Sequence, residues 1–215
     1  MQEIEVSFTQ FVDFTLKRGQ SKITKVKQIR NKEYDAAYDF WRELKGGISH
    51  QLRTGANLDS LDEVIVEANE HKRHHYEEAV RQYKWFCRGK ELEWFEPEAA
   101  SWHFGRLTVR ATPDLGLRIN GQRYLIKLYF KEATQKLQKR TAAAALALMT
   151  AAADTTTEQQ KDTIYGMLNL KKAALYPMTP AQLNDDLLLL LEGEAAHFVH
   201  LWEHLESREA LQRML

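Results

Sequence analysis

A run of basic residues near the N-terminus could neutralise phosphates of a nucleic acid. Between residues 17 and 32 the chain has seven basic residues and no acidic one, and such side chains bind phosphate through charge and hydrogen bonds. The run consists of Lys17, Arg18, Lys22, Lys25, Lys27, Arg30 and Lys32. The alternatives are that the run is a solvated face, or that it attracts the acidic segment 185–209.

A predicted β-hairpin gathers a second group of polar residues. Its turn is the Asn-Gly pair at residues 120–121, which is typical of a type I′ turn. Side chains alternate between two faces as one counts outward from this turn, and Asp114 then lies opposite Lys127. The polar face would hold Arg110, Thr112, Asp114, Lys127, Tyr129 and Lys131. Its cations, Arg110 among them, could bind phosphate, although any hairpin with one face in water looks similar.

The order of elements around Pro113 and Asp114 resembles that of the PD-(D/E)XK nuclease superfamily. A helix, a strand, the Pro-Asp pair, a strand that ends in a lysine, a helix and a further strand are expected, with the resemblance covering about 106–175. The resemblance implies that Asp114 is the first of two carboxylates that hold a divalent metal, Mg²⁺ or Mn²⁺. It also implies that an acid-x-lysine motif on the next strand supplies the second carboxylate, and a lysine that supports the attacking water or the phosphate.

The acid-x-lysine motif is incomplete in both registers that the resemblance allows. In one register Lys131 is the lysine, and Tyr129 stands where the second acid belongs. In the other register Lys127 is the lysine, and Leu125 stands there. A tyrosine phenol stays protonated at neutral pH and is a poor Mg²⁺ ligand, so we expect an impaired or absent metal site. Two carboxylates elsewhere could replace the missing acid, Glu93 and Glu132.

Three functions follow from these patterns. The first is a nucleic-acid-associated protein that binds DNA or RNA and has a degenerate, non-catalytic nuclease-like core. The second is a helical scaffold that docks a protein partner and has no role with nucleic acid, which the amphipathic helices and balanced charge would suit. The third is a divergent nuclease that uses Mg²⁺ or Mn²⁺ and in which Asp114, Lys127, Tyr129 and Lys131 form the catalytic group.

Two groups of histidines have helical spacing. They are His71, His74 and His75 in one segment and His197, His200 and His204 in another. Facing histidines at such spacing can bind zinc, but neither a cysteine nor an HExxH pattern accompanies them. A solvated helix face is the alternative for the first group, because charged residues surround it.

Composition indicates a globular protein in a reducing compartment. Hydrophobic residues make up 44% of the chain, and its 30 basic and 30 acidic residues balance. Cys87 is the only cysteine, so it cannot form an intramolecular disulfide. The sequence has neither a signal-peptide pattern nor an apolar run of transmembrane length. We therefore expect a cytoplasmic protein with no membrane association.

The helix and strand signals indicate an α+β protein in which residues 1–215 form one domain. The N-terminal part, 7–88, is expected to be helical, an αβ core should follow at 90–176, and helices should return at 179–215. The core is expected to contain a small antiparallel or mixed sheet around the hairpin at about 106–131. Helices from both ends of the chain would flank it.

Capping signals and apolar spacing set the expected helices. Ser7 and Gln10 have the spacing of a capping box that opens the first helix. Three longer helices are expected at 35–52, 60–88 and 132–153. Residues 20–32 fit neither a helical nor a strand period, and 163–175 is expected to be one strand.

Overall fold

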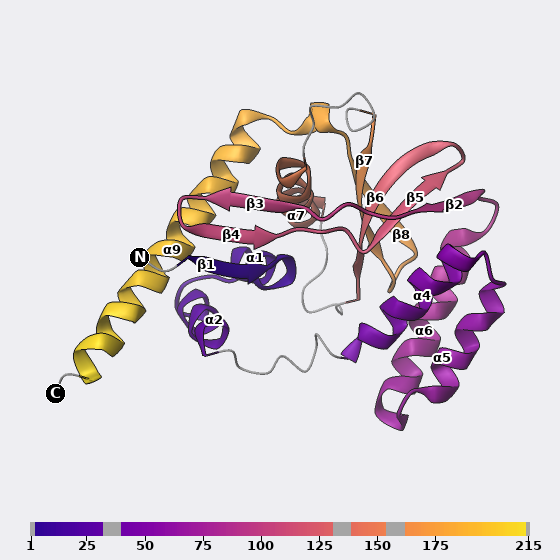
Figure 1. The fold of residues 1–215 in the computed structure, drawn as a ribbon, viewed down its shortest axis with the longest axis horizontal. Coiled ribbons are helices and arrows are strands. Elements are labelled where there is room, and N and C mark those ends of the chain that lie inside the picture. Colours follow the sequence, from indigo (N-terminus) through magenta and orange to yellow (C-terminus); the bar gives the residue numbers. More distant parts are fainter. Residues whose placement is uncertain (1–2, 32–39, 131–138, 154–161, 214–215) are drawn as a thin grey trace.

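The computed structural model describes residues 3–31, 40–130, 139–153 and 162–213. In these residues the chain forms two mixed β-sheets with helices packed on them, which confirms the predicted α+β class (Figure 1). A five-stranded sheet has the order β2-β5-β6-β7-β8, and a three-stranded sheet has the order β1-β4-β3.

The five-stranded sheet contains the predicted hairpin. Its strands are β2 (Leu92–Phe95), β5 (Leu115–Ile119), β6 (Gln122–Tyr129), β7 (Ile164–Asn169) and β8 (Ala174–Met178). Asn120 and Gly121 both have positive φ, 50° and 82°, as a type I′ turn requires. The predicted register is confirmed, since Ile119 pairs with Gln122 and strands β5 and β6 run antiparallel. Strand β7 then lies parallel to β6 after a helical crossover.

The three-stranded sheet corrects the prediction that residues 106–119 form one continuous hairpin strand. It consists of β1 (Ile4–Ser7), β3 (Ser101–Phe104) and β4 (Leu107–Arg110). Strand β4 therefore belongs to one sheet and β5 to the other. Pro113 lies between them and has no amide hydrogen to donate to a strand ladder, so the chain leaves the first sheet there and enters the second.

The helices are α1 (Phe8–Thr15), α2 (Gln20–Arg30), α4 (Arg42–Thr54), α5 (Leu61–Glu67), α6 (Glu70–Cys87), α7 (Lys139–Ala152) and α9 (Asp185–Arg213), with 3₁₀ turns at Leu58–Ser60 and Pro180–Gln182. The capping box of Ser7 and Gln10 forms as predicted. Residues 20–30, which fit neither period, are helical. The start of the predicted helix at 35–52 lies outside the described residues, as does the start of the one at 132–153.

Two predicted elements are divided in the structure by polar side chains that bind the backbone. The helix expected at 60–88 ends at Glu67 because Ala68 is extended, and Asn69 caps the new helix by accepting a hydrogen bond from the Lys72 N–H. The strand expected at 163–175 turns back into β8 after Asn169, whose side chain accepts from the Lys171 N–H. In both places a hydrogen bond from a local polar side chain to the backbone ends the helix or strand, although the spacing of apolar residues in the sequence continues beyond that point.

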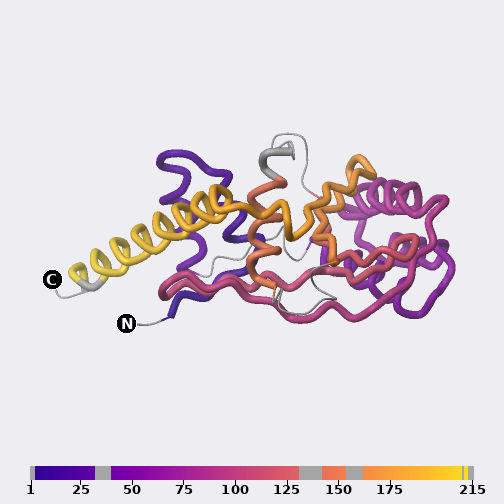
Figure 2. The backbone as a smooth tube through the Cα atoms, turned by 90° about the horizontal axis from the view of Figure 1, so that it is seen from above, coloured from indigo at the N-terminus to yellow at the C-terminus, as the bar shows by residue number. Residues whose placement is uncertain are grey.

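Two hydrophobic clusters cover opposite faces of the five-stranded sheet. Helices α4, α5 and α6 pack on one face, around side chains such as Leu117 and Ile126. Helix α7 covers the other face, around Leu125 and Met167, and this cluster continues into the three-stranded sheet, α1, α2 and α9. Helix α9 lies beside α2 at the far end of the molecule (Figure 2). No helix of the described residues is long and apolar enough to cross a membrane.

Candidate functional site

Asp114 lies where the chain enters strand β5 from the three-stranded sheet. Its backbone N–H donates to the Ile126 carbonyl at 2.9 Å, which holds it against β6. The neighbouring Pro113 is buried, and the Asp114 side chain is only 16% exposed. The carboxylate is therefore held in a largely desolvated position at the end of the sheet.

Every oxygen of the Asp114 carboxylate has a donor. Lys127 Nζ donates to Oδ1 at 3.0 Å, and the Leu128 backbone N–H donates to Oδ2 at 2.9 Å. Lys45 of helix α4 places its Nζ 3.4 Å from both oxygens. Burial on its own raises the pKa of Asp114, but the two lysines and the Leu128 N–H outweigh burial. The pKa of this carboxyl therefore lies below its ordinary value.

The position across from Asp114 holds a lysine rather than a second acid. Lys127 lies there, with its Nζ also bonded to the Thr112 carbonyl at 2.8 Å. For a second carboxylate to face Asp114 across the hairpin, residue 127 would have to be the acid. The acid-x-lysine motif would then span residues 127 to 129, with its lysine at residue 129. The two registers predicted from the sequence put the acid position at residue 125 or at residue 129. Each is therefore two residues away from the position that faces Asp114.

Of the other residues predicted to share the hairpin face, Arg110 lies away from Asp114. Arg110 is exposed in the three-stranded sheet and lies 3.5 Å from a carboxylate oxygen of Glu5, so the prediction that it shares a hairpin face with Asp114 is wrong. Tyr129 is half-buried near Asp13. Its burial is the main cause that raises the pKa of the phenol, and the negative charge of Asp13 raises this pKa further. Lys131 lies outside the described residues.

Of the two carboxylates that could replace the missing acid, the structure describes only Glu93, which pairs with another residue. Glu93 on strand β2 lies opposite Arg118 on strand β5, with 4.0 Å between their charged groups. Glu132 lies outside the described residues. In the part of the chain that the structure describes, no group of three or more histidine, cysteine or acidic side chains is arranged to hold a metal ion, and the two histidine groups are included in this statement.

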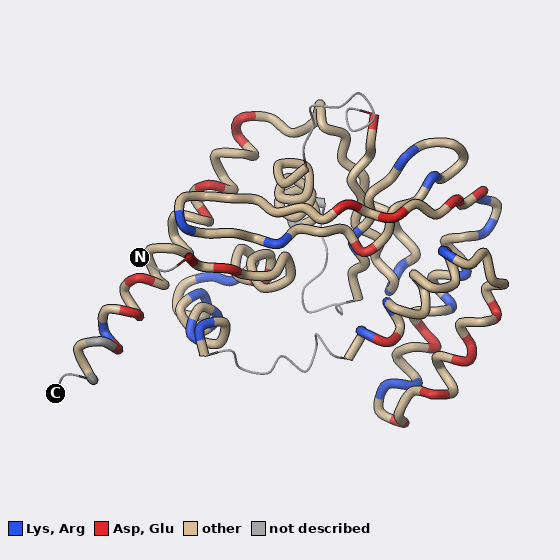
Figure 3. Tube along the Cα trace, viewed as in Figure 1, with Lys and Arg blue, Asp and Glu red and all other residues tan. Residues whose placement is uncertain are grey.

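Four of the seven residues of the basic run lie on helix α2, which is coloured by residue type in Figure 3. Lys22 is buried, pairs with Glu194 of helix α9 and lies over the Phe14 ring. Arg30 pairs with Glu209 of the same helix at 2.9 Å. These pairs match the alternative in which the basic run attracts the acidic segment 185–209.

The rest of the basic run has varied surroundings. Lys25 lies 3.5 Å from a carboxylate oxygen of Asp13, and Lys17 is half-buried. Arg18 and Lys27 are exposed, and Lys32 lies outside the described residues. The positive surface of the described part of this run is therefore smaller than its basic residues in the sequence suggest.

A second group of cations lies beside helix α6, with Arg81 on the helix, Arg88 just after its end and Lys172 in the turn between β7 and β8. Arg81, Arg88 and Lys172 surround the exposed side chain of Trp85. Arg81 and Trp85 lie one turn apart on α6, and Arg88 follows the last residue of the helix, three positions after Trp85. This spacing is visible in the sequence, but an apolar residue at such spacing is more often part of the core.

Comparison with known proteins adds no family to these observations. No protein-family model matches the chain, and no curated protein matches it. The resemblance to the nuclease superfamily therefore stays a prediction from the sequence. Along the chain the structure has β4, the Pro-Asp pair, the β5–β6 hairpin, α7 and β7 in this order, with β4 in a different sheet from the hairpin.

Proposed function

We propose that the protein binds nucleic acid and that its nuclease-like core does not cleave it. The observation that carries the proposal is the group formed by Asp114, Lys127 and Lys45. In this group the two lysines bind the carboxylate oxygens that a metal ion would need as ligands. One acid and two lysines leave a formal charge of +1 at neutral pH. Such a group repels a divalent cation and attracts a phosphate.

The accessibility of this group supports binding rather than a purely internal role. The Lys127 and Asp114 side chains are 14% and 16% exposed, whereas that of Lys45 is 31% exposed. A phosphate oxygen approaching from solvent would meet Lys45 first. The order of elements after Asp114, with a hairpin, a helix and a parallel strand, is the order that the resemblance expects.

The direct test combines binding with cleavage. Labelled single-stranded and duplex DNA and RNA would be titrated by fluorescence anisotropy without metal, and the same substrates incubated with Mg²⁺ or Mn²⁺. We expect binding that weakens as salt rises, and no cleavage above that of the Asp114→Ala variant. Metal-dependent cleavage that Asp114→Ala abolishes would overturn the non-catalytic assignment. A lack of binding even at low salt would overturn the association with nucleic acid.

A variant that rebuilds the acid-x-lysine motif tests the replaced acid directly. Lys127→Glu combined with Tyr129→Lys places a carboxylate across from Asp114 and a lysine two residues later. We expect Mn²⁺ at ten times its Kd to raise the Tm of this variant by about 3 °C and to leave the wild-type Tm unchanged. The matched control is Lys127→Gln with Tyr129→Lys, which lacks the second acid. An equal rise of Tm in the wild-type protein would contradict the proposed loss of the metal site.

A further inference from the structure

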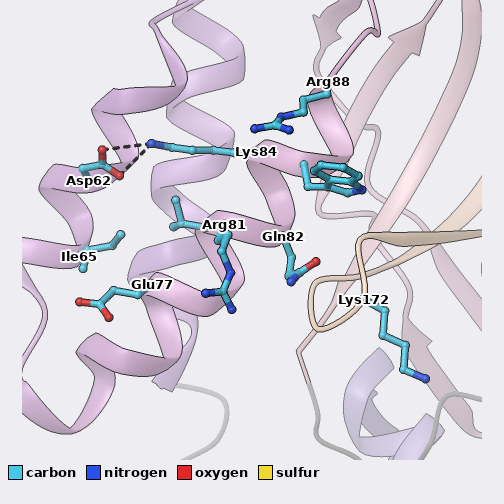
Figure 4. Close-up of a pocket in the computed structure, with 10 residues that line it drawn as sticks. Asp62, Ile65, Glu77, Arg81, Gln82, Lys84, Arg88 and Lys172 are labelled. Carbon is cyan, nitrogen blue, oxygen red and sulfur yellow. Dashed lines mark hydrogen bonds and ion pairs between the residues drawn. The ribbon is translucent and has the colours of Figure 1, made fainter.

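The outer face of helix α6 carries a groove that is separate from Asp114 and from helix α2. Its volume is about 600 Å³, and it lies between helices α5 and α6 and the turn that joins β7 to β8 (Figure 4). It is lined by Asp62, Ile65, Glu77, Val80, Arg81, Gln82, Lys84, Trp85, Arg88 and Lys172. A volume of roughly 300–1,000 Å³ is typical of ligand-binding pockets.

Trp85 exposes a large aromatic surface in this groove. Its side chain is 61% exposed, while the next two residues, Phe86 and Cys87, are buried. The Arg88 guanidinium lies over one side of the indole, 4.8 Å from the ring centroid. Leaving so much apolar surface in water is unfavourable, and a flat ring beside a cation is a surface on which another flat group can stack.

The cations around Trp85 differ from one another in their partners. Lys84 is bound by acids, with its Nζ 2.9 Å from Asp59 and 3.0 Å from Asp62. Arg81, Arg88 and Lys172 are exposed, and in the described residues none of these three forms an ion pair. One further acid, Glu77, lines the groove. Three exposed cations against one uncommitted acid give the groove a positive charge.

We propose that this groove binds single-stranded nucleic acid, with a base stacked on Trp85 and phosphates held by Arg81, Arg88 and Lys172. The proposal rests on the proposed association with nucleic acid and assigns it a strand type and a surface. An exposed ring among cations combines the two contacts that single strands use, stacking on aromatic side chains and attraction of the backbone. In a duplex the bases stack on one another, so their faces cannot stack on the Trp85 ring.

An acidic polypeptide is the competing ligand, because it would also be attracted to the three cations. It has no series of flat groups that require an aromatic surface, so its binding would depend on charge alone. Trp85 therefore discriminates between the two ligands. Loss of its ring should weaken the binding of a single strand and leave the binding of an acidic polypeptide unchanged.

The experiment measures the affinity of a labelled 12-nucleotide dT strand by fluorescence anisotropy. We expect Trp85→Ala to weaken binding about tenfold, since a base stacked on an aromatic side chain is lost, and Trp85→Phe to restore most of it. Arg81→Gln with Arg88→Gln should weaken binding and reduce the slope of log K against log salt by about 1.4, which is the change for two lost phosphate contacts. All of these side chains are exposed or half-exposed, and circular dichroism would verify that each variant folds.

The matched control replaces two exposed cations elsewhere, with Arg18→Gln just before helix α2 and Lys27→Gln on that helix. We expect this variant to bind the strand as the wild type does. If the control loses affinity while the variants of the groove keep it, the protein still binds nucleic acid but the groove is not the site. If no variant and no wild-type protein binds any strand, the association itself fails. If polyglutamate binds wild type and Trp85→Ala equally while dT does not bind, the groove takes an acidic polypeptide and the inference is overturned.

Discussion

Helices α2 and α6 carry their positive charge in opposite ways. On α2 the basic residues are dense in the sequence, yet Lys22 and Arg30 reach acids of helix α9. Around α6 the cations are sparser in the sequence, but Arg81 on the helix and Arg88 just after its end line one groove and form no ion pair in the described part of the chain. Positive charge that can attract a ligand therefore depends on helical phase and on what each face packs against.

The packing of α2 explains why its charges are used internally. Val26 and Ile29 are buried and fix which side of this 11-residue helix faces the protein. Lys22 and Arg30 lie next to that side, so their charged groups must be paired when they are removed from water. Helix α9 supplies the partners, Glu194 and Glu209, from a single acidic helix.

The largest expected effect would come from removing a cation that is buried and paired. Lys127→Met leaves the desolvated Asp114 with the more distant Lys45, so we expect the free energy of unfolding to fall by about 2–3 kcal/mol. Urea denaturation would measure it. Lys45→Met, at a more exposed and longer contact, should cost less than about 1 kcal/mol. Equal costs for the two variants would contradict the difference between buried and exposed partners.

A smaller effect is expected within helix α2 itself. Lys22→Met removes the cation that pairs with Glu194 and lies over the Phe14 ring, and we expect it to cost about 1–2 kcal/mol. Lys27→Met, on the exposed side of the same helix, should change stability by less than about 0.5 kcal/mol. Urea denaturation of the two variants compares the two sides of the helix. If Lys27→Met proved the more costly, the inward and outward assignments of these lysines would be wrong.

The smallest expected effect is a change in the acid dependence of stability. The pKa of Asp114 is held below its ordinary value, so its stabilising contribution is complete above the unfolded-state pKa near 3.9 and is lost as the pH falls further. Asp114→Asn should therefore show a shallower fall of stability below about pH 4 than the wild type does. Urea denaturation at pH 3 to 7 would measure both slopes. Identical slopes would show that Asp114 does not bind its lysines more tightly in its ionised form.

The hairpin was predictable from sequence because its signals are local. The Asn-Gly turn requires positive φ at both residues, and alternation then fixes the partner of every residue from Leu115 to Ile126. The pairing of Asp114 with Lys127 follows from the same count. The α+β class was predictable for a similar reason, since the spacing of apolar residues changes between helical and extended segments.

Features that depend on contacts distant in sequence were not predictable. The approach of Lys45 to Asp114 joins helix α4 to the hairpin, and no spacing in the sequence indicates it. The division of the chain around Pro113 between two sheets depends on β1, which pairs with β4. Strand β1 lies about a hundred residues earlier in the sequence. The exposure of Trp85 is not predictable for the same reason, because it stands beside Phe86 and Cys87 in an apolar run and only the packed helix shows which of the three side chains faces water.

Strand β1 has a consequence for how the protein folds. It pairs in parallel with β4, so Ile4 meets Leu107 and Ser7 meets Arg110. Contacts between segments so distant in the chain form slowly, because a long loop must be closed before they contribute. During synthesis the first strand leaves the ribosome long before its partner exists. We therefore expect β1 to reach its native place late, and until β4 pairs with it both edges of β1 are open to pairing with another chain.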